Sequence, residues 1–144
     1  MRILAVILLV SGTALAQAPA PADRQPIRPV GTTSELMVTV IRPASDAIFY
    51  IETRTPKDGD AWTVLEGQAL MVAEAANLLM LPGRARDDTQ WMADAALMRE
   101  AGAAAFKAAK TRKVEALAAV NDQLYESCTT CHRHYRPGYG RRGR

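Results

Sequence analysis

Apolar side chains recur at three- and four-residue steps through most of this chain, and this helical period limits its fold more than any other feature. Between Thr32 and Pro137 no segment shows a convincing two-residue alternation, so strands are not expected. The part of the chain that shows this period consists of four segments joined by short connections. Four such segments in a folded part of about 110 residues predict an all-α protein, an antiparallel up-down-up-down four-helix bundle.

The first segment opens with a capping box, Thr32-x-x-Glu35, and runs to the turn sequence that starts at Thr55-Pro56. Pro43 lies inside this segment. A proline leaves the carbonyl four residues earlier without its helical partner, so we expect a kink at this point. The apolar stripe of the segment comprises Leu36, Val40, Ala44, Ala47 and Ile51.

The other three segments are expected at Asp60–Leu81, from Asp87 to about Thr111, and at Arg112–Arg136. Asp87-x-x-Gln90 resembles a capping pair. No Gly or Pro marks the boundary near Thr111, but one helix across it would far exceed the roughly 8–20 residues usual in globular domains. The second segment places Trp62, Leu65, Ala69, Val72, Ala76 and Leu79 on one face, and the third places Trp91, Ala95, Met98, Gly102, Ala105 and Ala109. The small residues of the third segment should let a neighbouring helix approach closely.

The N-terminus has the three parts of a secretory signal, namely Arg2, a short apolar run and the small-x-small site at residues 14–16. The run is shorter than the roughly 20 residues that span a bilayer, and an uncleaved anchor is the alternative. We therefore predict a periplasmic protein with no membrane span. Its parts are expected to be a signal peptide (1–16), a proline-rich leader that acts as a tether (17–31), the bundle (32–137) and a basic tail (138–144).

The motif Cys128-Thr129-Thr130-Cys131-His132 lies near the end of the fourth segment and has the Cys-x-x-Cys-His spacing that attaches c-type haem. On a helix Cys131 and His132 are three and four residues from Cys128, so all three project from one face. Each thiol can form a thioether with the porphyrin, and the imidazole of His132 can reach the iron as proximal ligand. One covalent haem c, with its iron, is the predicted cofactor.

Other uses of the two cysteines fit the sequence less well. A structural zinc site draws four ligands from two separated pairs, whereas the supply here is two cysteines, His132 and His134 within seven residues of one helix. His134 is more simply a surface histidine on another side of that helix. A thioredoxin-like redox pair expects a βαβ context. A disulfide is the other use of two close cysteines in an exported protein, but a helical Cys-x-x-Cys with a following His and no second pair favours thioethers.

The sixth position on the iron needs a ligand from another helix. Met37, one turn into the first segment, is the best placed in an up-down-up-down bundle, and its thioether would give His/Met ligation. The alternative is that Met37 is simply a core methionine. The layer around His132 is expected to contain Met37, Met80, Trp91 and Met92, whereas Met71 and Met98 lie nearer the middles of their helices and are poorer candidates.

Positive charge is concentrated at the C-terminal end of the chain. Without the signal peptide, 17 Lys and Arg face 15 Asp and Glu, a net charge of +2, and five of the arginines follow the motif. These arginines are scattered beside Gly138 and Gly140 and are expected to form a solvated tail, not a nucleic-acid site. An acidic redox partner is the other use that such a tail could serve.

The late motif, followed by Tyr135-Arg136, resembles the class II c-type cytochromes, a family that includes cytochrome c′. The resemblance covers residues 34–136, with Leu81-Pro82-Gly83 and Trp91 as weaker elements. It implies thioethers at Cys128 and Cys131, proximal ligation by His132, Arg136 near the proximal haem face and Trp91 in the haem surroundings. It also implies that Met37 faces the other side of the iron and that the protein could be a homodimer. Pro43 departs from the family pattern.

Within this family a ligating methionine is found in six-coordinate electron carriers, and an open position in five-coordinate proteins that bind nitric oxide or carbon monoxide. We expect a periplasmic one-electron carrier with His132/Met37 ligation, and the gas-binding protein is the alternative. An enzyme is not expected, because the sequence offers no distal His or Arg arrangement of the kind a peroxidase needs.

Overall fold

The computed structural model describes residues 26–138, and in that range the chain is helical and contains no strand. The expected all-helical fold is therefore confirmed. The predicted signal peptide, most of the leader and tail residues 139–144 lie outside the described residues. None of the helices within 26–138 is long and apolar enough to cross a membrane. The elements are α1 (Thr33–Leu36), η1 (Met37–Ile41), α2 (Arg42–Phe49), α3 (Gly59–Leu79), α4 (Gln90–Ala109), α5 (Val114–Ala118) and α6 (Asn121–Tyr135).

The first helical segment begins at the predicted capping box. The Glu35 amide donates to the Thr32 hydroxyl at 3.1 Å, and the Thr32 amide donates to the Glu35 carboxylate at 2.8 Å. Each bond satisfies a donor that the first helical turn would otherwise leave without a partner.

Pro43 is accommodated by a π-helical turn. Residues 37–41 form the π-helix η1, and the Arg42 amide donates to the Met37 carbonyl five residues earlier. We infer that the wider turn makes room for the proline ring, which also lacks an N–H to continue the α-helical pattern. The segment ends at Phe49, six residues before the expected stop, because Thr53 and Arg54 donate their amides to the Tyr50 carbonyl and form a turn.

α3 and α4 follow the predicted pattern closely, and every residue of their two expected apolar faces is buried. The start of α4 differs from the expectation. The helix begins at Gln90, and Asp87 lies outside it, although the Asp87 carboxylate still accepts the Trp91 amide at 2.9 Å. Asp87 thus satisfies a first-turn donor from the loop that precedes the helix.

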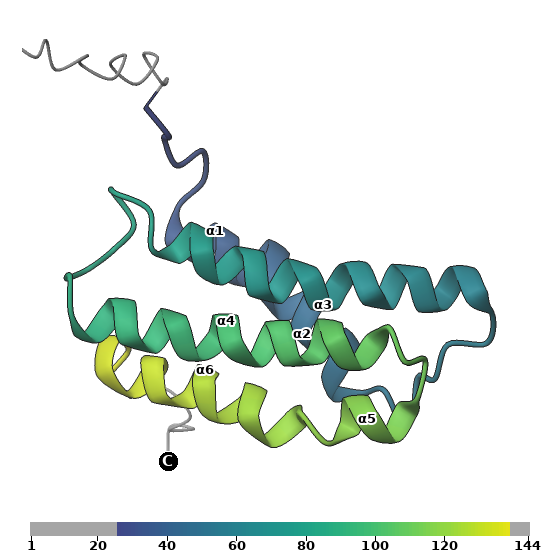
Figure 1. Cartoon of the computed structure of the whole chain (residues 1–144). Coiled ribbons are helices and arrows are strands. Elements are labelled where there is room, and N and C mark those ends of the chain that lie inside the picture. The colour runs from purple at the N-terminus through teal and green to yellow at the C-terminus, as the bar shows by residue number, and fades with distance from the viewer. Residues whose placement is uncertain (1–25, 139–144) are drawn as a thin grey trace, which may run out of the picture.

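Gly102 brings α3 and α4 into close contact. A Cβ atom at this position would lie 2.5 Å from the Ala73 nitrogen and 2.8 Å from the Ala73 Cα. The expected close approach is therefore confirmed, and the two helices lie side by side along most of their length (Figure 1).

The fourth segment is two helices, not the single helix expected from the sequence. Residues 110–113 separate α4 from α5, and Arg112 has a φ of 55°, so the predicted break near Thr111 is confirmed. A second break, at Ala119 and Val120, separates α5 from α6. The break brings Asn121 to the end of the first segment, where its side-chain amide donates to the Phe49 carbonyl at 3.4 Å.

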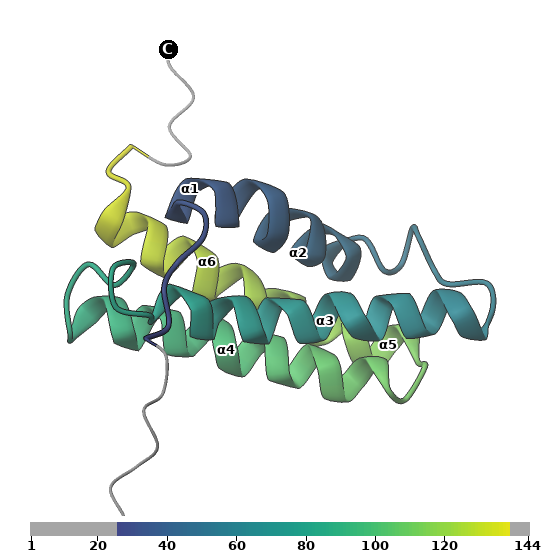
Figure 2. The same ribbon diagram turned by 90° about the horizontal axis from the view of Figure 1, so that it is seen from above.

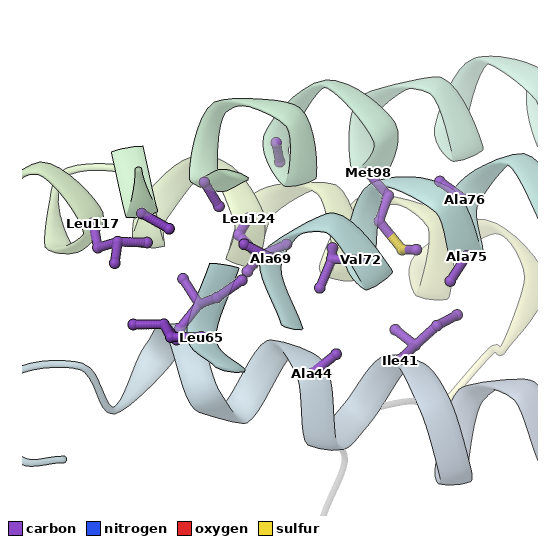
Figure 3. Packing of buried hydrophobic residues seen from close by; sticks show 14 of the residues in the cluster. Ile41, Ala44, Leu65, Ala69, Val72, Ala75, Ala76, Met98, Leu117 and Leu124 are labelled. Atoms are coloured by element: carbon purple, nitrogen blue, oxygen red, sulfur yellow. The ribbon is translucent and has the colours of Figure 1, made fainter. Parts of the chain in front are cut away.

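The first segment packs on α3 and α6 packs on α4, with one shared hydrophobic core. Figure 2 shows α1 at the same end of the molecule as the C-terminal end of α6. In Figure 3 the side chains of Ile41 and Ala44 point from the first segment towards α3. The arrangement is compatible with a four-helix bundle, with the first segment and α6 on neighbouring sides of the α3–α4 pair.

The last residues of the leader, 29–31, pack on the folded part of the chain. The buried Arg84 donates to the Gly31 carbonyl at 2.9 Å. Pro29 lies beside Gly83 in the same turn, where a Cβ on Gly83 would meet the proline ring. Residues 29–31 therefore pack on the turn after α3, whereas the sequence predicted a plain tether. The Arg84–Gly31 hydrogen bond joins residues far apart in the sequence, so the prolines of the leader could not predict it.

Candidate functional site

A cavity of about 630 Å³ lies between the first segment and α6, with α3 and α4 forming its floor. This volume is within the roughly 300–1,000 Å³ typical of small-molecule and cofactor sites. The first segment contributes Met37, Val38, Ile41, Arg42, Ser45, Asp46, Phe49 and Tyr50. The floor and the facing wall contribute Leu79, Asp94, Ala95, Met98, Tyr125, Ser127, Cys128, Thr129, Cys131, His132 and Arg136.

α6 brings all three chemically active side chains of the motif to this cavity. Cys128, Cys131 and His132 each line it, as their spacing along one helix face predicts. Arg136, one turn further on, lines it as well. The Ser127 hydroxyl, which the sequence did not single out, is buried and donates to the Leu124 carbonyl at 2.7 Å.

Both thiols are free, and burial keeps them protonated. Burial raises the pKa of Cys128, and it raises the pKa of Cys131 to about 11, with a further contribution from the negative charge of Asp94. Disulfide exchange needs a thiolate, which these surroundings disfavour. Within residues 26–138 no group of three or more His, Cys, Asp and Glu side chains is placed to hold a metal ion.

His132 is held in the form that a metal can bind. Burial lowers its pKa, and the nearby positive charge of Arg136 lowers it further. At neutral pH the imidazole is therefore uncharged and keeps a lone pair for a metal.

Met37 lies on the wall of the cavity contributed by the first segment, at the residue where η1 begins. The lining residues Met37, Ile41, Ser45 and Phe49 follow one another at four-residue steps. In a regular α-helix this spacing drifts around the axis, because one turn takes about 3.6 residues. The wider π turn reduces that drift, so η1 helps to keep Met37 on the same face as Ser45.

The other methionines are arranged differently from the expected layer. Met98, predicted to be a poorer candidate, lines the cavity, whereas Met80 and Met92 do not. The difference arises from which face of α4 is turned towards the cavity. Met98 lies one turn beyond Asp94 and Ala95 on the face that forms the floor, and Met92 lies on another face. Met71 is exposed on α3.

Trp91 is buried beside the cavity and does not line it. Its indole N–H donates to the Leu79 carbonyl at 2.8 Å, and its ring meets the ring of Tyr135 edge-on, with centroids 4.9 Å apart. Trp91 thus supports the end of α6, the helix that carries the motif.

Asp94 is a site residue that the sequence analysis missed. Its side chain is 1 % exposed, yet it lies on the cavity floor and accepts a hydrogen bond from the side-chain amide of Gln90 at 2.9 Å. His134 Nδ1 lies 2.7 Å from the other Asp94 oxygen. His134 is therefore partly exposed, as expected, but it is also tied to a buried carboxylate. The position of Asp94 within the apolar face of the third segment was the available signal.

Tyr135 connects the end of α6 to the loop before α4. Its hydroxyl donates to the Asp87 carboxylate. This bond, together with the Trp91 amide, lowers the pKa of Asp87 to about 2. Burial and then the Asp87 interaction raise the pKa of Tyr135 to about 12. The last turn of α6 is thus held by two side chains, Tyr135 and His134, that follow the motif directly.

No protein-family model matches this chain, and no curated protein or solved structure is significantly similar to it. A helical fold by itself does not define an activity. The function therefore has to be argued from the cavity and from the residues that line it.

Proposed function

We propose that this chain is a mono-haem c-type cytochrome of the class II type, exported to the periplasm, that carries single electrons. Cys128 and Cys131 would hold the haem through thioethers, His132 would be the proximal ligand and Met37 the distal ligand. One observation carries the proposal: the motif and Met37 line the same cavity from two different helical segments.

The chemistry of the cavity fits a porphyrin. Two protonated thiols and an uncharged imidazole lie on one wall, and apolar side chains such as Ile41, Leu79 and Met98 provide surfaces for a flat, largely apolar ring. A porphyrin supplies its own four nitrogen ligands, so the protein needs to contribute only axial ligands and not a cluster. When bound, the haem iron supplies a one-electron couple whose potential rises with His/Met ligation.

The register of the first segment and α6 supports the pairing of His132 with Met37. We propose that these two segments run in opposite directions, in an up-down-up-down bundle, with the Asn121–Phe49 hydrogen bond at one end. At 1.5 Å per residue, Met37 lies about 18 Å from Phe49 along its helix, and His132 lies about 17 Å from Asn121. The two side chains would then be level with each other on facing walls.

The surroundings of the cavity also favour a carrier. Arg133 and Arg136 are exposed at the end of α6 and would give an acidic redox partner a docking point beside the haem. His134 is bonded to Asp94 and so is not available as a distal acid or base.

Optical spectra of the protein produced with haem test the proposal. We expect covalent haem that is lost when Cys128 and Cys131 are replaced by Ala. We also expect a low-spin spectrum with the weak far-red sulfur-to-iron band in the oxidised state. Met37→Ala should abolish that band, because it removes the thioether, and Met71→Ala should leave it unchanged because Met71 is exposed on α3.

Two results would contradict parts of the proposal. A far-red band that survives Met37→Ala but disappears in Met98→Ala would assign the distal position to the methionine on the cavity floor. A high-spin spectrum in the unmodified protein that shifts on adding carbon monoxide would instead indicate the five-coordinate, gas-binding alternative.

A further inference from the structure

Ser45 has a buried hydroxyl with no hydrogen-bond partner. Ser45 as a whole is 5 % exposed, it lines the cavity, and no group within residues 26–138 bonds to its Oγ. Serine in a helix commonly bonds back to the carbonyl four residues earlier, as Thr39 does to Glu35 at 2.6 Å. Without such a bond, the Ser45 hydroxyl is left with a donor to offer to a polar group in the cavity.

Arg42 lies one turn before Ser45 and also lines the cavity. Within the described residues its guanidinium forms no ion pair, although Asp46 lies four residues further along the same helix. An unpaired arginine and an unpaired hydroxyl on one helix face together offer donors for a carboxylate, the group that guanidinium binds best.

The thioether edge of the porphyrin would lie against α6. Cys128 and Cys131, which would form the two thioethers, both line the cavity from that helix. Haem carries its two propionates on the edge opposite the two vinyl groups that form the thioethers. The propionates would therefore lie on the side of the ring away from Cys128 and Cys131, where Arg42 and Ser45 line the cavity from the first segment.

We propose that Arg42 and Ser45 form a carboxylate-binding subsite that holds one haem propionate. This inference rests on the proposed function. Ser45 is eight residues from Met37, or about 12 Å along the helix, so it serves the periphery of the ring and not the axial position. Arg42 supplies a charge-assisted bond at the exposed side of the subsite, and Ser45 supplies a neutral donor inside it.

Resonance Raman spectra of the purified haem-loaded protein test this subsite, because the propionate bending band responds to hydrogen bonds on the carboxylate. We expect the band to shift in Ser45→Ala and in Arg42→Gln. Arg42 is exposed, so its replacement leaves the core intact. Thr39→Ala, on the same helix but outside the cavity, and Arg99→Gln, which removes an equal charge from a surface ion pair, should leave the band in place. The iron coordination bands should be unchanged in all four variants.

The outcomes separate this inference from the proposed function. Covalent haem with a propionate band that is unchanged in both Ser45→Ala and Arg42→Gln would overturn the subsite alone. A band that shifts equally in the two control variants would also overturn it, because the effect would not be local. Unmodified protein that acquires no covalent haem would overturn the proposed function, and the subsite with it.

Discussion

Gly102 gives a quantitative test of how α3 and α4 pack. In Gly102→Ala the new Cβ would lie 2.5 Å from the Ala73 nitrogen, a backbone atom that cannot rotate away, so the two helices would have to separate. Overpacking of a core costs about 1–3 kcal/mol, and contact with backbone places this site near the upper end. Alanine regains about 1 kcal/mol through its helix propensity. We expect a net loss of about 2 kcal/mol in the free energy of unfolding.

Gly67→Ala is the matched control, because it makes the same chemical change within α3. A Cβ at Gly67 has nothing within 4 Å, so only helix propensity should act, and the variant should gain about 0.5–1 kcal/mol. The two variants should thus differ by about 3 kcal/mol. For a domain of this size that difference corresponds to roughly 15 °C in the melting temperature.

Thermal unfolding followed by far-UV circular dichroism measures both variants in the same haem-loaded form. A Gly102→Ala protein that melts at or above the unmodified protein, as Gly67→Ala should, would refute the close approach of the two helices. Urea unfolding provides a second measure, since a shifted midpoint with an unchanged slope reports stability alone.

Two further predictions concern the ends of the helices. The Asp58 carboxylate accepts the Ala61 amide at 2.8 Å, so Asp58→Ala should cost about 1 kcal/mol in urea unfolding, while Asp58→Asn, which keeps the acceptor, should cost far less. The pKa of Asp87 is lowered to about 2 from 3.8, so its ionised form stabilises the fold above about pH 4, and that contribution is lost as the pH falls towards 2. Asp87→Asn should therefore flatten the pH dependence of the melting temperature over this window. An unchanged slope would count against the Tyr135–Asp87 bond.

Much of the fold could be predicted from local sequence patterns. The capping box at Thr32, the apolar faces of α3 and α4 and the small residue at Gly102 are local signals, and each lies where expected. The π turn before Pro43 could not be predicted, because a proline in a helix can be relieved in several ways and neighbouring helices decide between them. The same holds for the break at Ala119, where no Gly or Pro interrupts the sequence.

The candidate site divides in a similar way. The placement of Cys128, Cys131 and His132 on one cavity wall follows from their spacing on a helix. Met98 lines the cavity floor and Met92 does not because of how α4 is rotated about its axis. The sequence prediction considered only the height of each methionine along the bundle and not this rotation. Asp94 stands out in the sequence as a charged residue within an apolar helix face, but only the tertiary structure shows that it lines the cavity and that His134 lies beside it.

By itself, then, the sequence determined the helical period, the ends of α3 and the placement of Cys128, Cys131 and His132 on one helix face, because each depends on residues within a few positions of one another. Only the tertiary structure decided what faces that motif. Met37, Ser45 and Arg42 come to it from a helix some ninety residues earlier, through packing that no short pattern encodes. The physical reason is that contacts across a bundle depend on the phase and register of whole helices, which are set by all of their packed neighbours at once.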